Sequence, residues 1–196
     1  MSDHHPQISE DRLFFLEKQE LVVEELDASG YILDIGGGGE GIIGRLKGQQ
    51  VIAIDSNRRE LEEAPAGPLK IVMDATQLQL LDGSFGVVTA FFTLMYIKGD
   101  DHRKVFEEVF RVLVRGGRFL VWDAELPRRG DEKKDIIVLP LTVKLPGEDV
   151  SAVYGVRWPE DGRSLGDYVG LAREAGFEVV SQVRQDSLVH LDLRKP

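Results

Sequence analysis

The chain has 196 residues, of which 42% are hydrophobic and 30% are charged, a balance typical of one globular domain with its own core. Its formal net charge of −10 disfavours nucleic acid as a partner, because an acidic surface repels phosphate backbones. The absence of cysteine excludes disulfides and thiolate chemistry, and no apolar run approaches the roughly 20 residues that cross a bilayer. We therefore expect a cytoplasmic protein that is not bound to a membrane.

Residues 1–9 are expected to form a flexible tail, and residues 10–196 a single domain. The segment "DRLFFLEKQELVVEEL", residues 11–26, places leucines among charges and predicts an amphipathic helix. No pair of histidines has metal-ligand spacing, so we predict no metal site; the four are His4, His5, His102 and His190.

The middle of the chain alternates short apolar runs with helical patterns. The runs that predict strands are "YILDIG", "VIAIDS", "LKIVMD", "FGVVTAFF" and "RFLVWDAEL". The segments that predict helices are "GIIGRL", "NRRELEEA" and "DDHRKVFEEVFRVL", the last with Gly116 and Gly117 at its end. This alternation predicts an α/β fold with a parallel sheet whose two faces are covered by helices.

The last third has a different pattern. Two extended segments flank the turn signal "PGED" and predict a β-hairpin lid, an insertion of about residues 130–160 outside the main sheet. The segment "SLGDYVGLAREAG" predicts a helix with Ser164 as its N-cap and Gly176 at its end. Two strands joined by a tight turn at Gln185–Asp186 then predict an antiparallel pair that completes the sheet.

Four consecutive glycines, Gly36 to Gly39, separate the first strand of this sheet from a helix. Glycines at this position let backbone N–H groups approach an anionic group closely. The spacing Gly36-x-Gly38-x-x-Gly41, with Asp55 further along the chain, also fits a dinucleotide fingerprint. A tight turn without a ligand is the structural alternative.

Three aspartates lie at the ends of the first three strands of this sheet. Asp55 can accept both hydroxyls of a ribose, or cap the helix that begins near Asn57. Asp34 would repel a pyrophosphate but attract the ammonium group of an amino acid. Asp74 can accept from an adenine amine while the Ala75 N–H donates to a ring nitrogen; its alternative role is again a helix cap.

With these residues in place, the chain resembles the class I S-adenosylmethionine-dependent methyltransferases of the small, free-standing bacterial and archaeal type. The motifs that carry the resemblance are "LDIGGGGEG", "VIAIDSN", "IVMDATQLQLLDGSFGVVTAFFTLMYI" and "HRKVFEEVFRVLVRGGRFLVWD". The resemblance implies a Rossmann-like, doubly wound sheet of seven strands in the order 3-2-1-4-5-7-6, with strand 7 antiparallel. The chain departs from the family pattern at Glu40, where a third glycine is common, and at Gly86, where aspartate is frequent.

The resemblance also implies that S-adenosylmethionine is the cofactor and S-adenosylhomocysteine the product. The methionine portion would lie against Asp34, Gly36, Gly37 and Gly38, and the ribose against Asp55 and Ser56. Asp74 and Ala75 would bracket the adenine. Ala90 and Phe91 would border the sulfonium.

Methyl transfer from a sulfonium requires positioning more than it requires a general base, so no catalytic residue is demanded by the sequence. Tyr96 and Asp123 are the first candidates to orient or deprotonate an acceptor, although each could serve packing or solvation alone. Further strand-end and hairpin candidates are Met95, Glu125, Tyr154 and Trp158. We expect a small-molecule acceptor and consider a homodimer through the hairpin. The alternative functions are an NAD(P)-dependent oxidoreductase and a non-catalytic S-adenosylmethionine-binding module.

Overall fold

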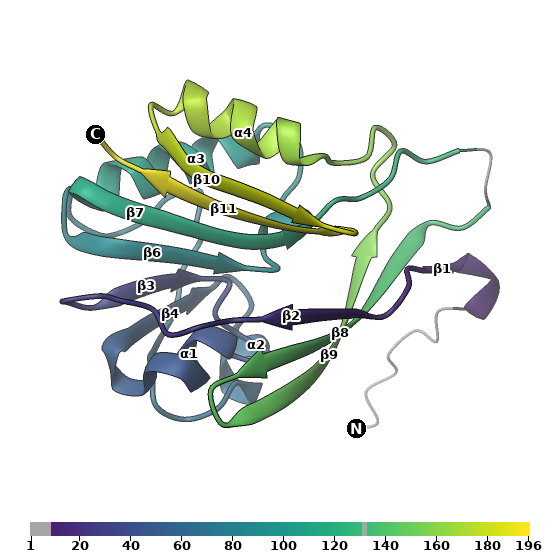
Figure 1. Ribbon diagram of the computed structural model, residues 1–196, viewed down its shortest axis with the longest axis horizontal. Coiled ribbons are helices and arrows are strands. Elements are labelled where there is room, and N and C mark those ends of the chain that lie inside the picture. The colour runs from purple at the N-terminus through teal and green to yellow at the C-terminus, as the bar shows by residue number, and fades with distance from the viewer. Residues whose placement is uncertain (1–8, 131–132) are drawn as a thin grey trace.

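A computed structural model describes residues 9–130 and 133–196 of the chain. The predicted tail, apart from Ser9, lies outside the described residues, as do His4 and His5. Figure 1 shows two sheets that meet near the middle of the molecule, with helices on both faces of the larger one.

The larger sheet has seven strands, which in chain order are β3 (Ile32–Ile35), β4 (Val51–Asp55), β5 (Leu69–Val72), β6 (Phe85–Phe91), β7 (Leu113–Ala124), β10 (Glu178–Gln185) and β11 (Leu188–Arg194). Their spatial order is β10-β11-β7-β6-β3-β4-β5. The strands from β5 to β7 pair in parallel, whereas β11 is antiparallel to both of its neighbours. Read from the β5 edge, this is the order 3-2-1-4-5-7-6 that the resemblance implies, with the seventh strand antiparallel.

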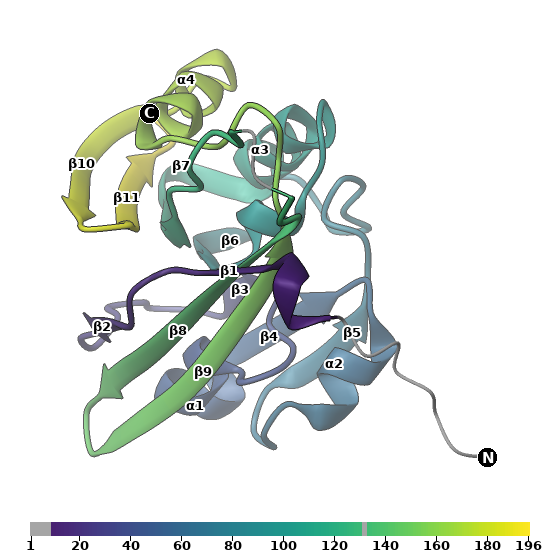
Figure 2. The ribbon, with the colours of Figure 1, turned by 90° about the vertical axis from the view of Figure 1, so that its right-hand side faces the viewer.

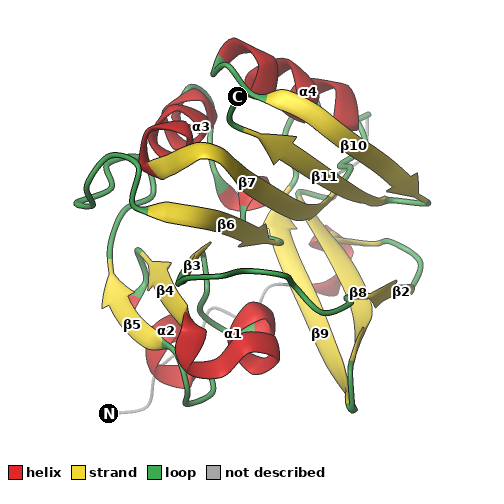
Figure 3. Cartoon of the chain, turned by 60° about the vertical axis from the view of Figure 1, so that its left-hand side comes forward, coloured by secondary structure: helices red, strands yellow, loops and turns green. Residues whose placement is uncertain are grey.

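The helices divide between the two faces of this sheet. They are α1 (Ile42–Lys47), α2 (Arg58–Glu63), α3 (Asp101–Val112) and α4 (Leu165–Glu174), with 3-10 turns η1 (Glu10–Arg12), η2 (Gly48–Gln50) and η3 (Leu94–Tyr96). Figure 3 shows α3 and α4 on the opposite side of the sheet from α1 and α2. Apolar residues of α3 and α4 share one buried cluster, and those of α1, α2 and the smaller sheet share the other. Covered faces explain why β3 is buried along its whole length.

The smaller sheet is built on a hairpin. Strands β8 (Ile136–Leu145) and β9 (Glu148–Arg157) pair antiparallel in unbroken register, and the register leaves Pro146 and Gly147 as the turn. Gly147 has φ +92°, a conformation that favours glycine. The predicted hairpin around "PGED" is therefore present, and Figure 2 shows it alongside the main sheet as a separate layer.

The predicted helix over residues 11–26 is wrong. This segment forms η1 and two short strands, β1 (Leu13–Phe15) and β2 (Gln19–Val22), which pair in parallel with β8. Around β2 burial alternates, because Gln19 and Val23 are buried whereas Glu20 and Val22 are exposed. The hairpin leaves one edge of β8 open for pairing. A segment whose side chains alternate between buried and exposed suits a strand at this edge better than it suits a helix.

Three local predictions can be compared with the structure. Ser164 is the N-cap of α4, as predicted. It forms a full capping box with Asp167, in which each side chain accepts a hydrogen bond from the backbone N–H of the other residue. The prediction that Gly116 and Gly117 end the preceding helix is wrong, because α3 ends at Val112 and both glycines lie in β7. The last turn is shifted by one residue, since Gln185 pairs with Leu188 and the turn is Asp186–Ser187.

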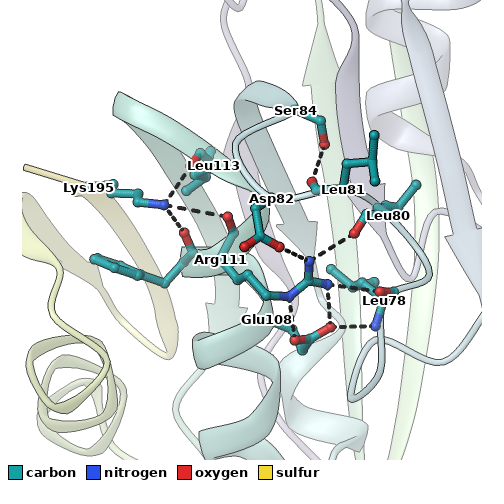
Figure 4. Close-up of polar contacts among 10 residues, drawn as sticks. Leu78, Leu80, Leu81, Asp82, Ser84, Glu108, Arg111, Leu113 and Lys195 are labelled. Atoms are coloured by element: carbon teal, nitrogen blue, oxygen red, sulfur yellow. Dashed lines mark hydrogen bonds and ion pairs between the residues drawn. The ribbon is translucent and has the colours of Figure 1, made fainter.

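A cluster of polar contacts anchors the loop between β5 and β6 (Figure 4). The Arg111 guanidinium on α3 donates to the carbonyl oxygens of Leu78 and Leu80, each at 2.8 Å. It also pairs with Asp82 at 2.6 Å and with Glu108 at 2.8 Å. Five donors in a fixed fork suit this task, which lets one side chain hold the loop that follows Asp74.

Candidate functional site

A cavity of about 830 Å³ opens at the carboxyl ends of β3, β4, β5 and β6, the edge where ligands bind in parallel sheets of this kind. Its wall has two parts. The first, here called the cofactor wall, consists of Asp34, the loop glycines 36–39 and 41, Asp55, Ser56, Asp74 and Ala75. The second, here called the hairpin wall, consists of Phe92, Tyr96, Val153, Tyr154 and Gly155.

The glycine loop is dictated by close packing as well as by backbone angles. A Cβ atom on Gly36 would lie 2.2 Å from the Thr93 Oγ1 atom, and one on Gly38 would lie 2.5 Å from the Glu60 Cβ atom. Gly36, Gly39 and Gly41 also have positive φ angles. The turn therefore needs glycines whether or not a ligand binds. Close packing and positive φ angles explain much of the glycine sequence from Gly36 to Gly41. The loop nonetheless forms the floor of the cavity.

Asp34 is a buried carboxylate with an unusual environment. It is 2% exposed, and its Oδ1 atom accepts a hydrogen bond of 2.7 Å from the Thr89 hydroxyl. No cationic side chain pairs with Asp34 within residues 9–130 and 133–196. Burial, reinforced by the charge of Asp55, raises its pKa to about 7. A cationic group that entered the cavity would stabilise the ionised carboxylate.

Asp55 ends β4 and performs part of its alternative role. Its Oδ1 atom accepts from the Asn57 N–H at 2.8 Å, while the Asn57 side chain is the N-cap of α2. Its Oδ2 atom lies toward the glycine loop, 2.9 Å from where a Cβ atom of Gly38 would stand. One carboxylate oxygen thus supports the turn and the other borders the cavity, next to Ser56.

Asp74 holds a turn but does not cap a helix. Its Oδ1 atom accepts from both the N–H and the hydroxyl of Thr76, each at 2.8 Å. Residues 74–80 contain no helix, so the alternative proposed from the sequence does not apply. Asp74 and Ala75 both line the cavity at the end of β5.

The two residues predicted at the end of β6 differ in position. Phe91 lines the cavity, whereas Ala90 is fully buried within the cluster that faces α3 and α4. Alternation along the strand explains the difference, because neighbouring side chains point to opposite faces. The prediction that Ala90 borders the ligand is therefore not supported by its place in the structure.

Phe92 and Thr93 line the cavity but were missed by sequence reasoning. Phe92 has φ +48°, which is rare for a bulky residue, and it is held there by an N–H bond of 2.8 Å to the Trp122 carbonyl oxygen. The Thr93 hydroxyl donates to the Ile35 carbonyl oxygen at 3.0 Å, which ties this turn to β3. Strained backbone at a cavity is frequent in functional sites, but no sequence pattern indicates it.

Tyr96 and Tyr154 bring the hairpin to the cavity. The Tyr154 ring stacks on Phe92 with 4.8 Å between centroids and 3° between planes. The Gly155 backbone lies beside the Tyr96 phenol, and the Glu40 carboxylate lies beside the Tyr154 phenol. Burial and nearby carboxylates raise the pKa of both phenols, so they remain protonated at neutral pH. They can orient an acceptor but do not act as bases.

Asp123 does not reach the cavity, so its placement beside the acceptor was wrong. It is fully buried, and it accepts from the N–H groups of Met95 and Ala124 and from the Tyr168 hydroxyl, the last at 3.3 Å. Burial raises its pKa to about 6, although these hydrogen bonds oppose the shift. Asp123 therefore holds η3, the turn that carries Tyr96.

The three remaining candidates, Met95, Glu125 and Trp158, make structural contacts. Met95 is buried in the core. The Glu125 carboxylate accepts from the Leu165 N–H and pairs with Arg184, each at 2.8 Å. The Trp158 indole donates to the Pro127 carbonyl oxygen at 2.7 Å. None of these three lines the cavity.

Comparisons with known proteins define the class. Residues 33–121 match a family model described as methyltransferase domain. Comparison with curated protein sequences gives no match.

In the part of the chain that the structure describes, no helix has both the length and the apolar character of a membrane-spanning segment.

Three solved structures with the same fold each share less than a fifth of their aligned residues with this chain. An S-adenosylmethionine-dependent methyltransferase from Mesorhizobium loti is 16% identical with a TM-score of 0.59, covering 86% of this chain and 93% of its own. The PH0226 protein from Pyrococcus horikoshii OT3 is 18% identical with a TM-score of 0.60, covering 85% and 82%. A glycopeptide N-methyltransferase complexed with S-adenosyl-L-methionine is 19% identical with a TM-score of 0.56, covering 87% and 89%.

Residues 33–121 thus match a methyltransferase domain, and the chain has the fold of the class I S-adenosylmethionine-dependent methyltransferases. The matched residues run from β3 to β7, which includes the whole cofactor wall.

Proposed function

We propose that the chain binds S-adenosylmethionine in the cavity and transfers its methyl group to a small-molecule acceptor. The observation that carries this proposal is Asp34, a buried carboxylate in the cavity wall without a cationic partner among the described residues. A buried charge of this kind is costly unless it is paired, and the ammonium group of a methionine moiety would pair with it.

The other groups of the cofactor wall fit the rest of this ligand. The Oδ2 atom of Asp55 borders the cavity, where it can accept from ribose hydroxyls. Asp74 and Ala75 lie one strand further along the same edge, at the place suited to an adenine. No basic side chain occurs among the described residues of the wall, and the N–H groups of Gly37, Gly39 and Gly41 already donate to backbone carbonyl oxygens. The Gly38 N–H is therefore the glycine donor that can meet the ligand carboxylate.

S-Adenosylmethionine, when bound, supplies an electrophilic methyl group on a sulfonium. The chain would contribute mainly by holding the acceptor at near-attack distance, which is worth roughly 7–11 kcal/mol in favourable cases. The hairpin wall faces this space, and η3 is held in place by Asp123. We assign no general base on the present geometry, because both cavity phenols stay protonated.

The hairpin supports the choice of a small acceptor. Strand β9 contributes Val153, Tyr154 and Gly155 to the wall and so limits the space above the glycine loop. A cavity of about 830 Å³ lies in the range typical of sites for cofactors and small molecules. A homodimer through the hairpin and a cytoplasmic location remain predictions from the sequence.

An oxidoreductase is less compatible with the wall than a methyltransferase is. A dinucleotide would place two phosphates near Asp34 and Asp55, and no basic side chain lines the cavity within the described residues to offset them. A binding module without activity has the same cofactor wall, so only turnover distinguishes it from an enzyme.

Thermal shift with S-adenosylhomocysteine, NAD and NADP tests the proposal. A ligand at 100 times its dissociation constant stabilises a protein by about 2.7 kcal/mol. We expect the sulfur nucleoside to stabilise the chain and the dinucleotides to have no effect. Stabilisation by NAD alone would contradict the proposal. Formation of S-adenosylhomocysteine from S-adenosylmethionine in an acceptor panel then separates an enzyme from a binding module.

A further inference from the structure

The hairpin wall lines the cavity together with Glu40 of the glycine loop. Phe92 and Tyr96 enter it from the chain that follows β6, and Tyr154 enters it from β9. Glu40 enters from the glycine loop, at the position where the sequence departs from the family pattern. These four side chains are the groups that an acceptor would meet.

Aromatic rings dominate this end of the cavity. Phe92 and Tyr154 stack in parallel with centroids 4.8 Å apart, and this contact fixes the hairpin against the end of β6. Tyr96 adds a third ring from η3, which Asp123 holds from behind. Such rings attract cations through their negative faces and tolerate apolar groups equally well.

The charged side chains that line the cavity are all acidic among the described residues. Six carboxylates line the cavity, namely Asp34, Glu40, Asp55, Glu60, Glu63 and Asp74. No lysine, arginine or histidine does so among the described residues. Glu40 is the cavity carboxylate that lies beside the Tyr154 phenol.

The same carboxylates act on two ionisable groups of the cavity wall. Burial and the charges of Asp55, Glu63 and Glu40 raise the pKa of Glu60. Burial and the charges of Asp123, Glu40 and Glu60 raise that of Tyr96. An anionic acceptor would meet this field unfavourably, whereas a cationic one would relieve it.

We infer that the acceptor is a small molecule carrying a basic amine, held by the Glu40 carboxylate and the rings of Phe92, Tyr96 and Tyr154, and that the reaction is N-methylation. This inference rests on the proposed function and specifies its second substrate. It follows from the aromatic wall, the single carboxylate that joins it and the lack of any basic side chain among the described residues of the cavity.

The transfer balances as follows. The acceptor ammonium would release one proton through the cavity mouth to water, which leaves a lone pair on nitrogen. That lone pair forms the N–C bond as the S–C bond breaks, and the electron pair of the broken bond stays on sulfur. The sulfonium becomes a neutral thioether, and the positive charge passes to the methylated amine.

The test uses the full chain saturated with S-adenosylhomocysteine. Ligand-observed NMR would screen matched sets of fragments that share a skeleton and differ in one group, such as benzylamine, benzyl alcohol and benzoate. We expect amines to bind at least about ten-fold more tightly than their neutral or anionic counterparts. Equal binding across the three groups, a preference for carboxylates or no binding by any amine would overturn the inference.

Two charge-neutralising variants make the test specific. Glu40→Gln should weaken amine binding by about ten-fold, because it removes the carboxylate beside the rings. Glu62→Gln changes the net charge equally but lies on the exposed face of α2, paired with Arg58, and should have no effect. Equal losses in both variants would attribute the preference to net charge and refute the site.

The cofactor titration separates the two levels of the proposal. Isothermal titration of wild type and Glu40→Gln with S-adenosylhomocysteine precedes the screen. If the nucleoside does not bind to wild type, the proposed function fails. If it binds while amines do not, only the inference about the acceptor fails. A Glu40→Gln variant that binds the nucleoside normally has kept its fold, so a loss of amine binding then concerns the acceptor.

Discussion

The cofactor wall and the hairpin wall face the same cavity but are assembled in different ways. In the cofactor wall, Asp34 and Asp55 lie at the ends of β3 and β4 and Asp74 follows β5, so their meeting is a consequence of the parallel part of the main sheet. In the hairpin wall, Tyr154 belongs to a second sheet and reaches the cavity by stacking on Phe92. The geometry of the cofactor wall therefore follows from the main sheet alone, whereas the hairpin wall also requires the second sheet to pack against it.

The largest effect should come from Asp55→Ala in the cofactor wall. Loss of a charge-assisted pair to two ribose hydroxyls should weaken S-adenosylhomocysteine binding about 100-fold, or about 3 kcal/mol. Isothermal titration measures the affinity. Asp161→Ala is the matched control, because Asp161 is exposed and pairs with Arg128 outside the cavity. An unchanged affinity would remove Asp55 from the ribose site.

The support of the cofactor wall can be broken from behind through Arg111. Arg111→Ala removes several charge-assisted hydrogen bonds to the loop after Asp74 and should lower the free energy of unfolding by about 2 kcal/mol. Urea denaturation measures this loss. Arg103→Ala removes an exposed ion pair with Glu174 and should cost less than about 1 kcal/mol. Equal losses would show that the loop is not anchored as Figure 4 suggests.

The pH dependence of binding would sharpen the role of Asp34. With a pKa of about 7 in the free protein, Asp34 is mostly protonated at pH 6, and a ligand ammonium binds to the ionised form. Affinity for S-adenosylhomocysteine should therefore fall by about ten-fold from pH 8 to pH 6. Titration over this range should show the fall in wild type, whereas an Asp34→Asn variant should show none.

The same carboxylate affects the free protein in the opposite sense. Asp34 and Asp123 have pKa values of about 7 and about 6, above the usual value of 3.8, so the folded chain binds protons more tightly than the unfolded chain. Their contribution to stability is present at acid pH and is lost as pH rises through 6 and 7. Urea denaturation at pH 5 and pH 8 should show a smaller difference in Asp123→Asn than in wild type. A larger difference in the variant would contradict the assignment.

The smallest effect concerns the hairpin wall. Tyr154→Phe keeps the ring stack with Phe92 and removes only the phenol oxygen beside Glu40. Because Tyr154 contacts no group of the cofactor wall proper, we expect the affinity for S-adenosylhomocysteine to change by less than about three-fold. A loss as large as that of Asp55→Ala would show that the two walls act as one.

Local sequence was a good guide where one segment carries its own signal. The strand followed by glycines predicted β3 and the start of α1, and Ser164 predicted the N-cap of α4. It failed for residues 11–26, since charged and apolar residues alternate there in a way that suits a strand only when β8 provides an edge. Propensity over a short segment is a weak guide when a partner strand is available.

The predictions for the candidate site were likewise correct for some residues and wrong for others. Most of its predicted cofactor residues line the cavity because they sit at strand ends, whereas Ala90 and Asp123 turn into the core. Both errors arise from the two-residue period of a strand, which selects the face by register with its neighbours. Phe92 and Thr93 were not predicted, since no pattern of residues announces a positive φ angle at a phenylalanine.

The sequence by itself determined the alternation of strands and helices, the glycine turn and the carboxylates at three strand ends, because each depends on residues close together in the chain. Only the tertiary structure decided that residues 11–26 pair with a hairpin, that Asp123 is buried and that Glu40 meets Tyr154. Those outcomes depend on contacts between distant segments, whose free energy is realised only when the whole chain has folded.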